Sequence, residues 1–167
     1  MFYAKHPVQS YHSIDLPEII WNGALTLWNA LPNETFQFVT SKTVGEKRFN
    51  FYPAQFIDNI PKGHFDIIFN ISSFEEMDKE VRDRYVHGVK EWAKKPTLFI
   101  NLNRRRLLKE NGKMWDNHPL FYPYNPEEIV LDWSVDRMQE TVRTNSTSSL
   151  FAVYPKSFAM IRLSLIR

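Results

Sequence analysis

An acidic side chain stands where an apolar run gives way to the start of a helix. The segment Tyr11–Pro17 reads Tyr-His-Ser-Ile-Asp-Leu-Pro. Its first five residues form a strand pattern that ends in Asp15. Pro17, two residues later, suits the first turn of a helix. In nucleotide-binding α/β domains an acidic residue at such a strand end hydrogen-bonds a ribose. An aspartate at this place also caps helices through its carboxylate, and Asp15 is compatible with both roles.

Two glutamates and a histidine are the candidates for proton transfer. Glu75 and Glu76 lie in a polar turn, residues 72–77, after an apolar run, and a carboxylate beside an acceptor hydroxyl acts as a general base. Ser73 and Glu76 also match a capping box, which would give this glutamate a structural role. His118, in Asp-Asn-His-Pro, is a further candidate base, although a loop histidine is more often only solvated.

Composition argues against several other kinds of site. The five glycines are too widely spaced for a phosphate-binding loop, and none of the ten residues before Tyr11 is a glycine. With no cysteine and five scattered histidines, the sequence gives no set of metal ligands, although carboxylates from separated loops could assemble an oxygen site. The net charge of +2 does not indicate a nucleic-acid surface. The chain has a single basic cluster, Arg104–Arg106, which is either a solvated loop or a contact for phosphate groups. No apolar run approaches the ~20 residues of a membrane span, so we expect a cytoplasmic protein.

An alternation of strands and helices must position these residues. Apolar stripes at helical spacing predict two helices, one beginning at Pro17 (Ile20, Ala24, Leu27, Trp28, Leu31) and one through Val81, Tyr85, Val89 and Trp92. Strands are predicted at residues 8–15, 35–40, 64–71, 97–102, 128–134 and 157–166, a loop at 43–51, and a connection with a short helical turn at 52–61. The run 64–71 is nearly continuously apolar, as in a strand covered on both faces at the centre of a sheet. This order predicts one α/β domain over residues 1–167 with a mainly parallel sheet.

Four segments in this order resemble a known family. They are Ile14-Asp15-Leu16-Pro17-Glu18, Phe65-Asp66-Ile67-Ile68-Phe69-Asn70, Ser73-Phe74-Glu75-Glu76-Met77 and Phe99-Ile100-Asn101-Leu102-Asn103-Arg104. Together they are similar to segments of the sugar O-methyltransferase family, which belongs to the class I S-adenosylmethionine-dependent methyltransferases. The resemblance covers about residues 8–106. It implies a Rossmann-like sheet with helices on both faces and an antiparallel C-terminal strand pair, with the first strand and its glycine-rich motif missing.

The resemblance also implies a function, namely O-methyl transfer from S-adenosylmethionine to a hydroxyl of a sugar or a nucleotide-linked sugar. Asp15 would bind the ribose, Phe56 or its neighbours would flank the adenine, and Asn70 with Ser72 would face methionine and acceptor. Glu76, Glu75 or His118 would be the base. Asn70 is equally compatible with bonding nearby backbone.

Because the glycine-rich motif is missing, we expect the chain to be the C-terminal part of a longer enzyme. The alternative is a non-catalytic binding or partner subunit that keeps the fold without a donor site. In either case we expect self-association through the sheet edge that the missing strand would leave exposed.

Overall fold

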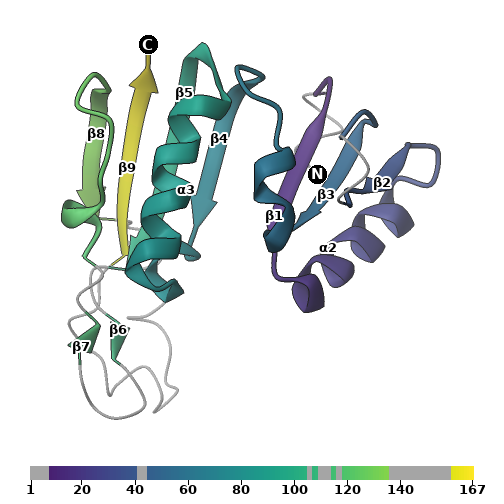
Figure 1. Cartoon of the computed structure of the whole chain (residues 1–167), viewed down its shortest axis with the longest axis horizontal. Helices are drawn as coiled ribbons and strands as arrows, with labels where there is room; N and C mark the ends of the chain where they lie inside the picture. Colours follow the sequence, from purple (N-terminus) through teal and green to yellow (C-terminus); the bar gives the residue numbers. More distant parts are fainter. Residues whose placement is uncertain (1–7, 41–44, 105–106, 109–113, 116–117, 136–158) are drawn as a thin grey trace. The chain divides into compact units, whose positions relative to one another are not determined.

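The computed structural model describes residues 8–40, 45–104, 107–108, 114–115, 118–135 and 159–167. The chain divides into two compact units, residues 1–61 and 62–167, which are described in turn (Figure 1). The prediction of a single methyltransferase-like domain over residues 1–167 stays a prediction.

Unit 1 is a small parallel sheet with one long helix. Its elements are β1 (Tyr11–Asp15), α2 (Pro17–Ala30), β2 (Phe36–Phe38), β3 (Phe49–Pro53) and the 3₁₀ helix η1 (Ala54–Asn59). The strand order is β1-β3-β2, and both pairs are parallel. As predicted, the helix begins at Pro17, and it ends at Ala30, two residues before Pro32.

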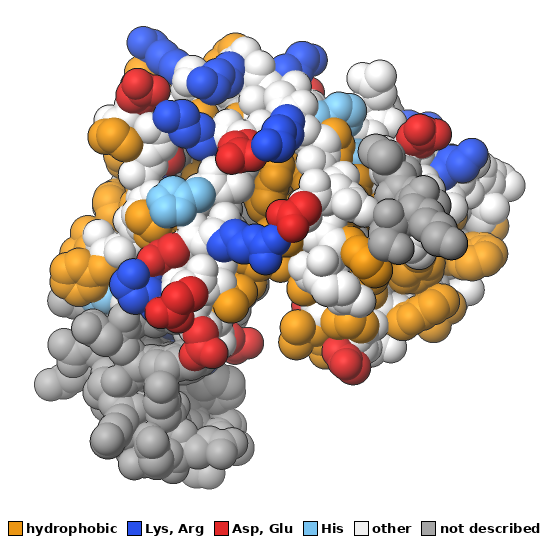
Figure 2. All heavy atoms as spheres, in the orientation of Figure 1, with side chains coloured by type: hydrophobic (Ala, Val, Ile, Leu, Met, Phe, Trp, Pro, Cys, Tyr) orange, Lys and Arg blue, Asp and Glu red, His pale blue; other side chains and the backbone are white. Residues whose placement is uncertain are grey.

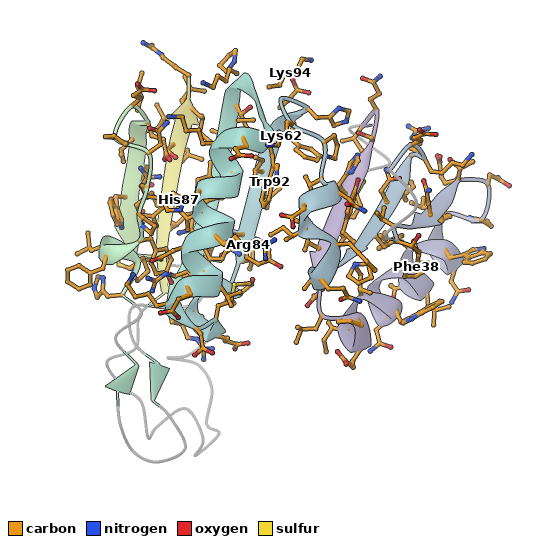
Figure 3. The ribbon with its side chains drawn as sticks, viewed as in Figure 1. Phe38, Lys62, Arg84, His87, Trp92 and Lys94 are labelled. Carbon is orange, nitrogen blue, oxygen red and sulfur yellow. The ribbon has the colours of Figure 1, made fainter. Side chains whose placement is uncertain are left out.

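The core of unit 1 lies between α2 and the sheet. Ile20 and Ala24 of the helix are buried with Phe49 and Phe51 of β3. Phe38 of β2, labelled in Figure 3, meets the ring of Trp21 at a centroid distance of 4.2 Å. Trp28, which we predicted in the buried stripe, is instead exposed and stacks on Phe36. The buried face of α2 is therefore narrower than the spacing of its apolar residues predicts.

The predicted loop at residues 43–51 is wrong for its last three residues, because β3 begins at Phe49 and forms the middle strand of this sheet. Its polar residue, Asn50, is fully buried. The Asn50 amide bonds both the backbone N–H and the carbonyl of Lys47, at 3.0 and 2.5 Å. Local backbone groups thus satisfy a polar side chain inside the sheet.

Unit 2 holds a mixed sheet and a helix. Its elements are β4 (Phe65–Ile71), η2 (Phe74–Glu76), α3 (Lys79–Trp92), β5 (Ala93–Arg104), β6 (Leu107–Leu108), β7 (Met114–Trp115), η3 (Pro119–Phe121), β8 (Ile129–Val135) and β9 (Ala159–Ile166). The four-stranded sheet has the order β4-β5-β9-β8, with β4 and β5 parallel and β9 antiparallel to both β5 and β8. Strands β6 and β7 form a separate antiparallel pair. The predicted α/β class, with parallel strand pairs and an antiparallel C-terminal pair, is confirmed.

Helix α3 lies over one face of the four-stranded sheet (Figure 1). Tyr85, Val89 and Trp92 of the helix are buried, as is Phe99 of β5. Val81, which we predicted in the same buried stripe, is exposed. None of the described helices is long and apolar enough to span a membrane.

The prediction that the run 64–71 forms the centre of a sheet is wrong for the described residues. There β4 pairs with β5 alone, and three of its apolar side chains are exposed. A continuous apolar run cannot distinguish a central strand from an edge strand whose faces are both apolar. Self-association through an exposed sheet edge stays a prediction.

Candidate functional site

Asp15 lies at the carboxyl end of β1, at the edge of the sheet of unit 1. Its carboxylate is exposed and accepts a hydrogen bond from the backbone N–H of Leu16 at 2.8 Å. The N-cap position of α2 is Leu16, and no side chain caps the helix. Asp15 therefore does not act as the helix cap, and its carboxylate stays at the strand end, where parallel sheets gather ligands.

The 3₁₀ helix η1 brings an aromatic ring to the same edge. In the parallel register Asp15 is opposite Pro53, and η1 begins at the next residue, Ala54. Phe56 is half-buried inside this short helix, at a kink where its φ and ψ are −104° and 23°. Because η1 contacts β1, a carboxylate and an aromatic side chain share one edge of unit 1.

A pair of rings holds the two strands that carry this edge. The Nδ1 atom of His12 lies 3.1 Å from the hydroxyl of Tyr52, and the rings stack with centroids 5.6 Å apart. Burial raises the pKa of Tyr52 to about 12, although a hydrogen bond with the backbone of Gly45 lowers it. The phenol is therefore neutral at physiological pH and serves as a fixed hydrogen-bonding partner.

In unit 2, three asparagines meet where β4 and β5 end. Asn70 and Asn101 are neighbours in the parallel register, and both are buried. The Asn103 amide donates to the Oδ1 atoms of Asn70 and Asn101, at 2.8 and 2.6 Å. Asn101 in turn donates to the hydroxyl of Tyr124 at 2.7 Å. Asn70 is thus part of a side-chain network rather than bonded only to nearby backbone.

Ser72 directly follows β4 and has a φ of 55°, in the left-handed region that favours glycine. Its backbone N–H donates to the carbonyl of Leu102 at 2.7 Å, which holds the turn against the end of β5. Strained backbone of this kind collects at functional sites. Ser72 therefore keeps its place as a candidate contact beside Asn70.

Glu75 and Glu76 have different surroundings. The Glu75 side chain is 1% exposed, and its carboxylate accepts from both the backbone N–H and the Nε of Arg104. The Glu76 side chain is 62% exposed and lies 3.2 Å from Nη2 of the same arginine. The buried carboxylate thus holds η2 to the end of β5, whereas Glu76 faces solvent.

The remaining residues predicted near this site are Ser73, His118 and the arginines of the basic cluster. Ser73 makes no side-chain capping bond, so the expected capping box is absent from the described structure. His118 precedes η3, and its Nδ1 accepts from the backbone N–H of Leu120 at 3.1 Å. This histidine caps a short helix. Arg105 and Arg106 lie outside the described residues.

The predicted site residues therefore form two groups, each within one unit. Asp15 and Phe56 share an edge in unit 1, whereas Asn70, Ser72 and Glu75 surround the carboxyl ends of β4 and β5 in unit 2. The described residues contain no cluster of three or more histidine, aspartate or glutamate side chains arranged to hold a metal ion.

Sequence reasoning missed the residues that complete the second group. Asn101 and Asn103 stand two apart in β5, so both point to the same face of the sheet. Tyr124 accepts from Asn101, and burial raises its pKa well above the ordinary tyrosine value despite the nearby guanidinium of Arg162. The alternation Asn-x-Asn at the end of an apolar strand was the available signal.

Comparison with known proteins finds similarity among solved structures. No protein-family model and no curated protein matches the chain. Among solved structures, the chain is similar to that of CrArsM, an arsenic(III) S-adenosylmethionine methyltransferase from Chlamydomonas reinhardtii, with 9% sequence identity and a TM-score of 0.49. The match covers 94% of this chain and 55% of that chain, so this chain spans about half the length of that enzyme. At this similarity, the activity of that enzyme says nothing about which residues of this chain act.

Proposed function

We propose that the chain binds S-adenosylmethionine and contributes to O-methyl transfer to a hydroxyl of a sugar or a nucleotide-linked sugar. The observation that carries the proposal is the edge of unit 1, where the exposed carboxylate of Asp15 lies opposite Pro53 and Phe56 follows in η1. A carboxylate at a strand end suits the two hydroxyls of a ribose, and an aromatic ring suits the face of an adenine. These two side chains therefore fit the nucleoside part of the donor.

When bound, S-adenosylmethionine supplies an electrophilic methyl group on a sulfonium. The protein's part is to bind and orient the reactants and to accept the proton of the acceptor hydroxyl. Of the three candidate bases, Glu76 is the one with an exposed carboxylate, since Glu75 is engaged by Arg104 and the Nδ1 of His118 caps η3. We therefore assign the proton-accepting role to Glu76. Asn70 and Ser72 are the proposed contacts for methionine and acceptor.

One observation favours the second candidate function, a non-catalytic binding or partner subunit. Glu75 and His118 both have structural partners, and Glu76 pairs with Arg104 on the surface. If these carboxylates only stabilise the fold, the chain keeps the sheet but has no donor site. Whether the donor binds decides between the two candidates.

The test is calorimetric titration of the purified chain with S-adenosylhomocysteine. We expect micromolar binding to the wild type. Asp15→Asn, which keeps an oxygen for the N–H of Leu16 but removes the charge, should weaken it about 10- to 100-fold, because hydrogen bonds to charged groups contribute about 1.5–3 kcal/mol. Phe56→Ala should weaken it as well.

The matched control is Asp66→Asn. This aspartate is also exposed, but it pairs with Lys94 on β5 of unit 2, and we expect wild-type affinity. Heat equal to dilution in the wild type would remove the donor-binding proposal and leave the second candidate. Equal losses in Asp15→Asn and Asp66→Asn would remove the assignment of the site.

A further inference from the structure

Three strands of the four-stranded sheet in unit 2, β4, β5 and β9, share one apolar face, and the fourth strand, β8, continues that face with Ile129, Asp132 and Ser134. The register aligns three rows across β4, β5 and β9, which we call the apolar grid: Ile67, Leu98 and Leu165; Phe69, Ile100 and Leu163; Ile71, Leu102 and Ile161. All nine positions are aliphatic or aromatic. The neighbouring positions on the same strands, among them Phe99, Asn101 and Arg162, point to the other face and are buried.

The apolar grid is open to solvent along β4. Ile67, Phe69 and Ile71 are 48%, 59% and 60% exposed, and the other six side chains are half-buried. The other face lies under α3, whose outer side carries many charged residues (Figure 2). Exposed apolar patches of this kind are often functional.

Its chemistry favours a second copy of the same chain as the occupant. In a two-fold symmetric contact each patch meets itself, so any charge within it would face a like charge. The nine positions of the apolar grid contain no charge and no hydrogen-bonding side chain, and the charged Asp132 of β8 lies at the border of the grid, opposite Leu163. Two grids can therefore meet without placing a charge between them. Two such faces can pack about 10 Å apart, as the sheets of a β-sandwich do.

The exposed area is at the lower limit of what a specific dimer requires. The three β4 side chains together present roughly 250–300 Å², and their six half-buried neighbours add roughly 150–200 Å². Two copies would therefore bury roughly 800–1,000 Å², against about 1,000 Å² for the smaller specific interfaces. A contact of this size is weak and depends on protein concentration.

We propose that the chain forms a symmetric dimer in which the apolar grids of two copies pack face to face. Our sequence-based expectation placed self-association at a sheet edge, whereas the exposed apolar side chains lie on the face beside that edge. The proposal does not depend on donor binding.

Sedimentation velocity over the micromolar concentration range tests the dimer, and a matched pair of variants tests its surface. Ile67→Lys places a charge inside the proposed interface. Val81→Lys places one on α3, at a residue that is also β-branched and also 48% exposed. We expect the first to raise the dimer dissociation constant at least about 100-fold, because each copy would bury an unpaired charge. The second should leave it unchanged.

Cross-linking gives a readout that does not depend on a disruptive substitution. The chain has no cysteine, so Phe69→Cys and Val81→Cys each introduce a single thiol. We expect a short bis-maleimide reagent to link two copies through position 69 and not through position 81. A monomer at every concentration, equal effects of the two lysine variants, or equal cross-linking at both positions would each overturn the proposal.

Discussion

Removing the Glu75 carboxylate should destabilise unit 2 far more than removing its neighbour. Glu75 is 1% exposed and accepts from the backbone N–H and the Nε of Arg104. In Glu75→Ala both donors lose their acceptor. The hydrogen bond from the Glu75 backbone N–H to Asn103 can remain, since it does not use the side chain.

The magnitude follows from the burial of the two partners. Breaking a fully buried ion pair by removing one partner costs about 3–5 kcal/mol. The Arg104 side chain is 29% exposed, so its guanidinium can turn towards water and recover part of that loss. We expect Glu75→Ala to lower the free energy of unfolding by about 2–4 kcal/mol, a large share of the ~5–15 kcal/mol of a typical domain.

Urea unfolding followed by far-UV circular dichroism measures this loss. Glu76→Ala is the matched control, because Glu76 contacts the same arginine from an exposed position, and we expect a change within about 0.5 kcal/mol. Equal losses in the two variants, or no loss in Glu75→Ala, would refute the structural role of Glu75. Glu75 would then again be a candidate for the proton-accepting role that we propose for Glu76.

Three further predictions concern stability. Glu128→Ala should cost about 3–5 kcal/mol in urea unfolding, since Glu128 is paired with Arg162 at 2.5 Å and both side chains are 4% exposed; a loss below about 1 kcal/mol would contradict this. The pKa of Tyr52 is raised to about 12 by burial, so the folded state keeps a proton that the unfolded state releases near pH 10. The stability that Tyr52 contributes should hold below pH ~10 and fall by up to about 2–3 kcal/mol as the pH rises to about 12. Tyr52→Phe should reduce the total fall by about that amount, and the rest comes from groups such as Tyr122 and Tyr124, whose pKa values burial also raises. Ser72→Gly should raise the melting temperature slightly and Ser72→Ala should not, because φ is 55° at this position; the opposite order would show that the turn is not strained.

Local patterns in the sequence predict most of the elements. Apolar stripes predict the two helices, α2, which begins at Pro17, and α3, which ends at Trp92. Apolar runs predict the strands β4 and β9. Strand β3 is missed because its buried Asn50 is satisfied by Lys47 nearby, a bond that composition cannot reveal. Its last residue is also a proline, which normally argues against a strand.

The site is harder to predict because it depends on which strands are neighbours. The place of Asp15 follows from one segment, but the link between Asn70 and Asn103 requires the register of β4 on β5. Burial also divides adjacent residues of the same type. Glu75 and Glu76 are alike in the sequence, yet Arg104 reaches one inside the fold and the other on its surface.

The central claim is that the edge formed by β1 and η1 binds the nucleoside part of S-adenosylmethionine. Ultraviolet cross-linking of radiolabelled S-adenosylmethionine to the wild-type chain, followed by peptide mapping, tests it most directly. We predict a label within residues 54–59 that requires Phe56 and is suppressed by excess S-adenosylhomocysteine. The absence of a suppressible label, or a label confined to peptides of unit 2, would contradict the claim.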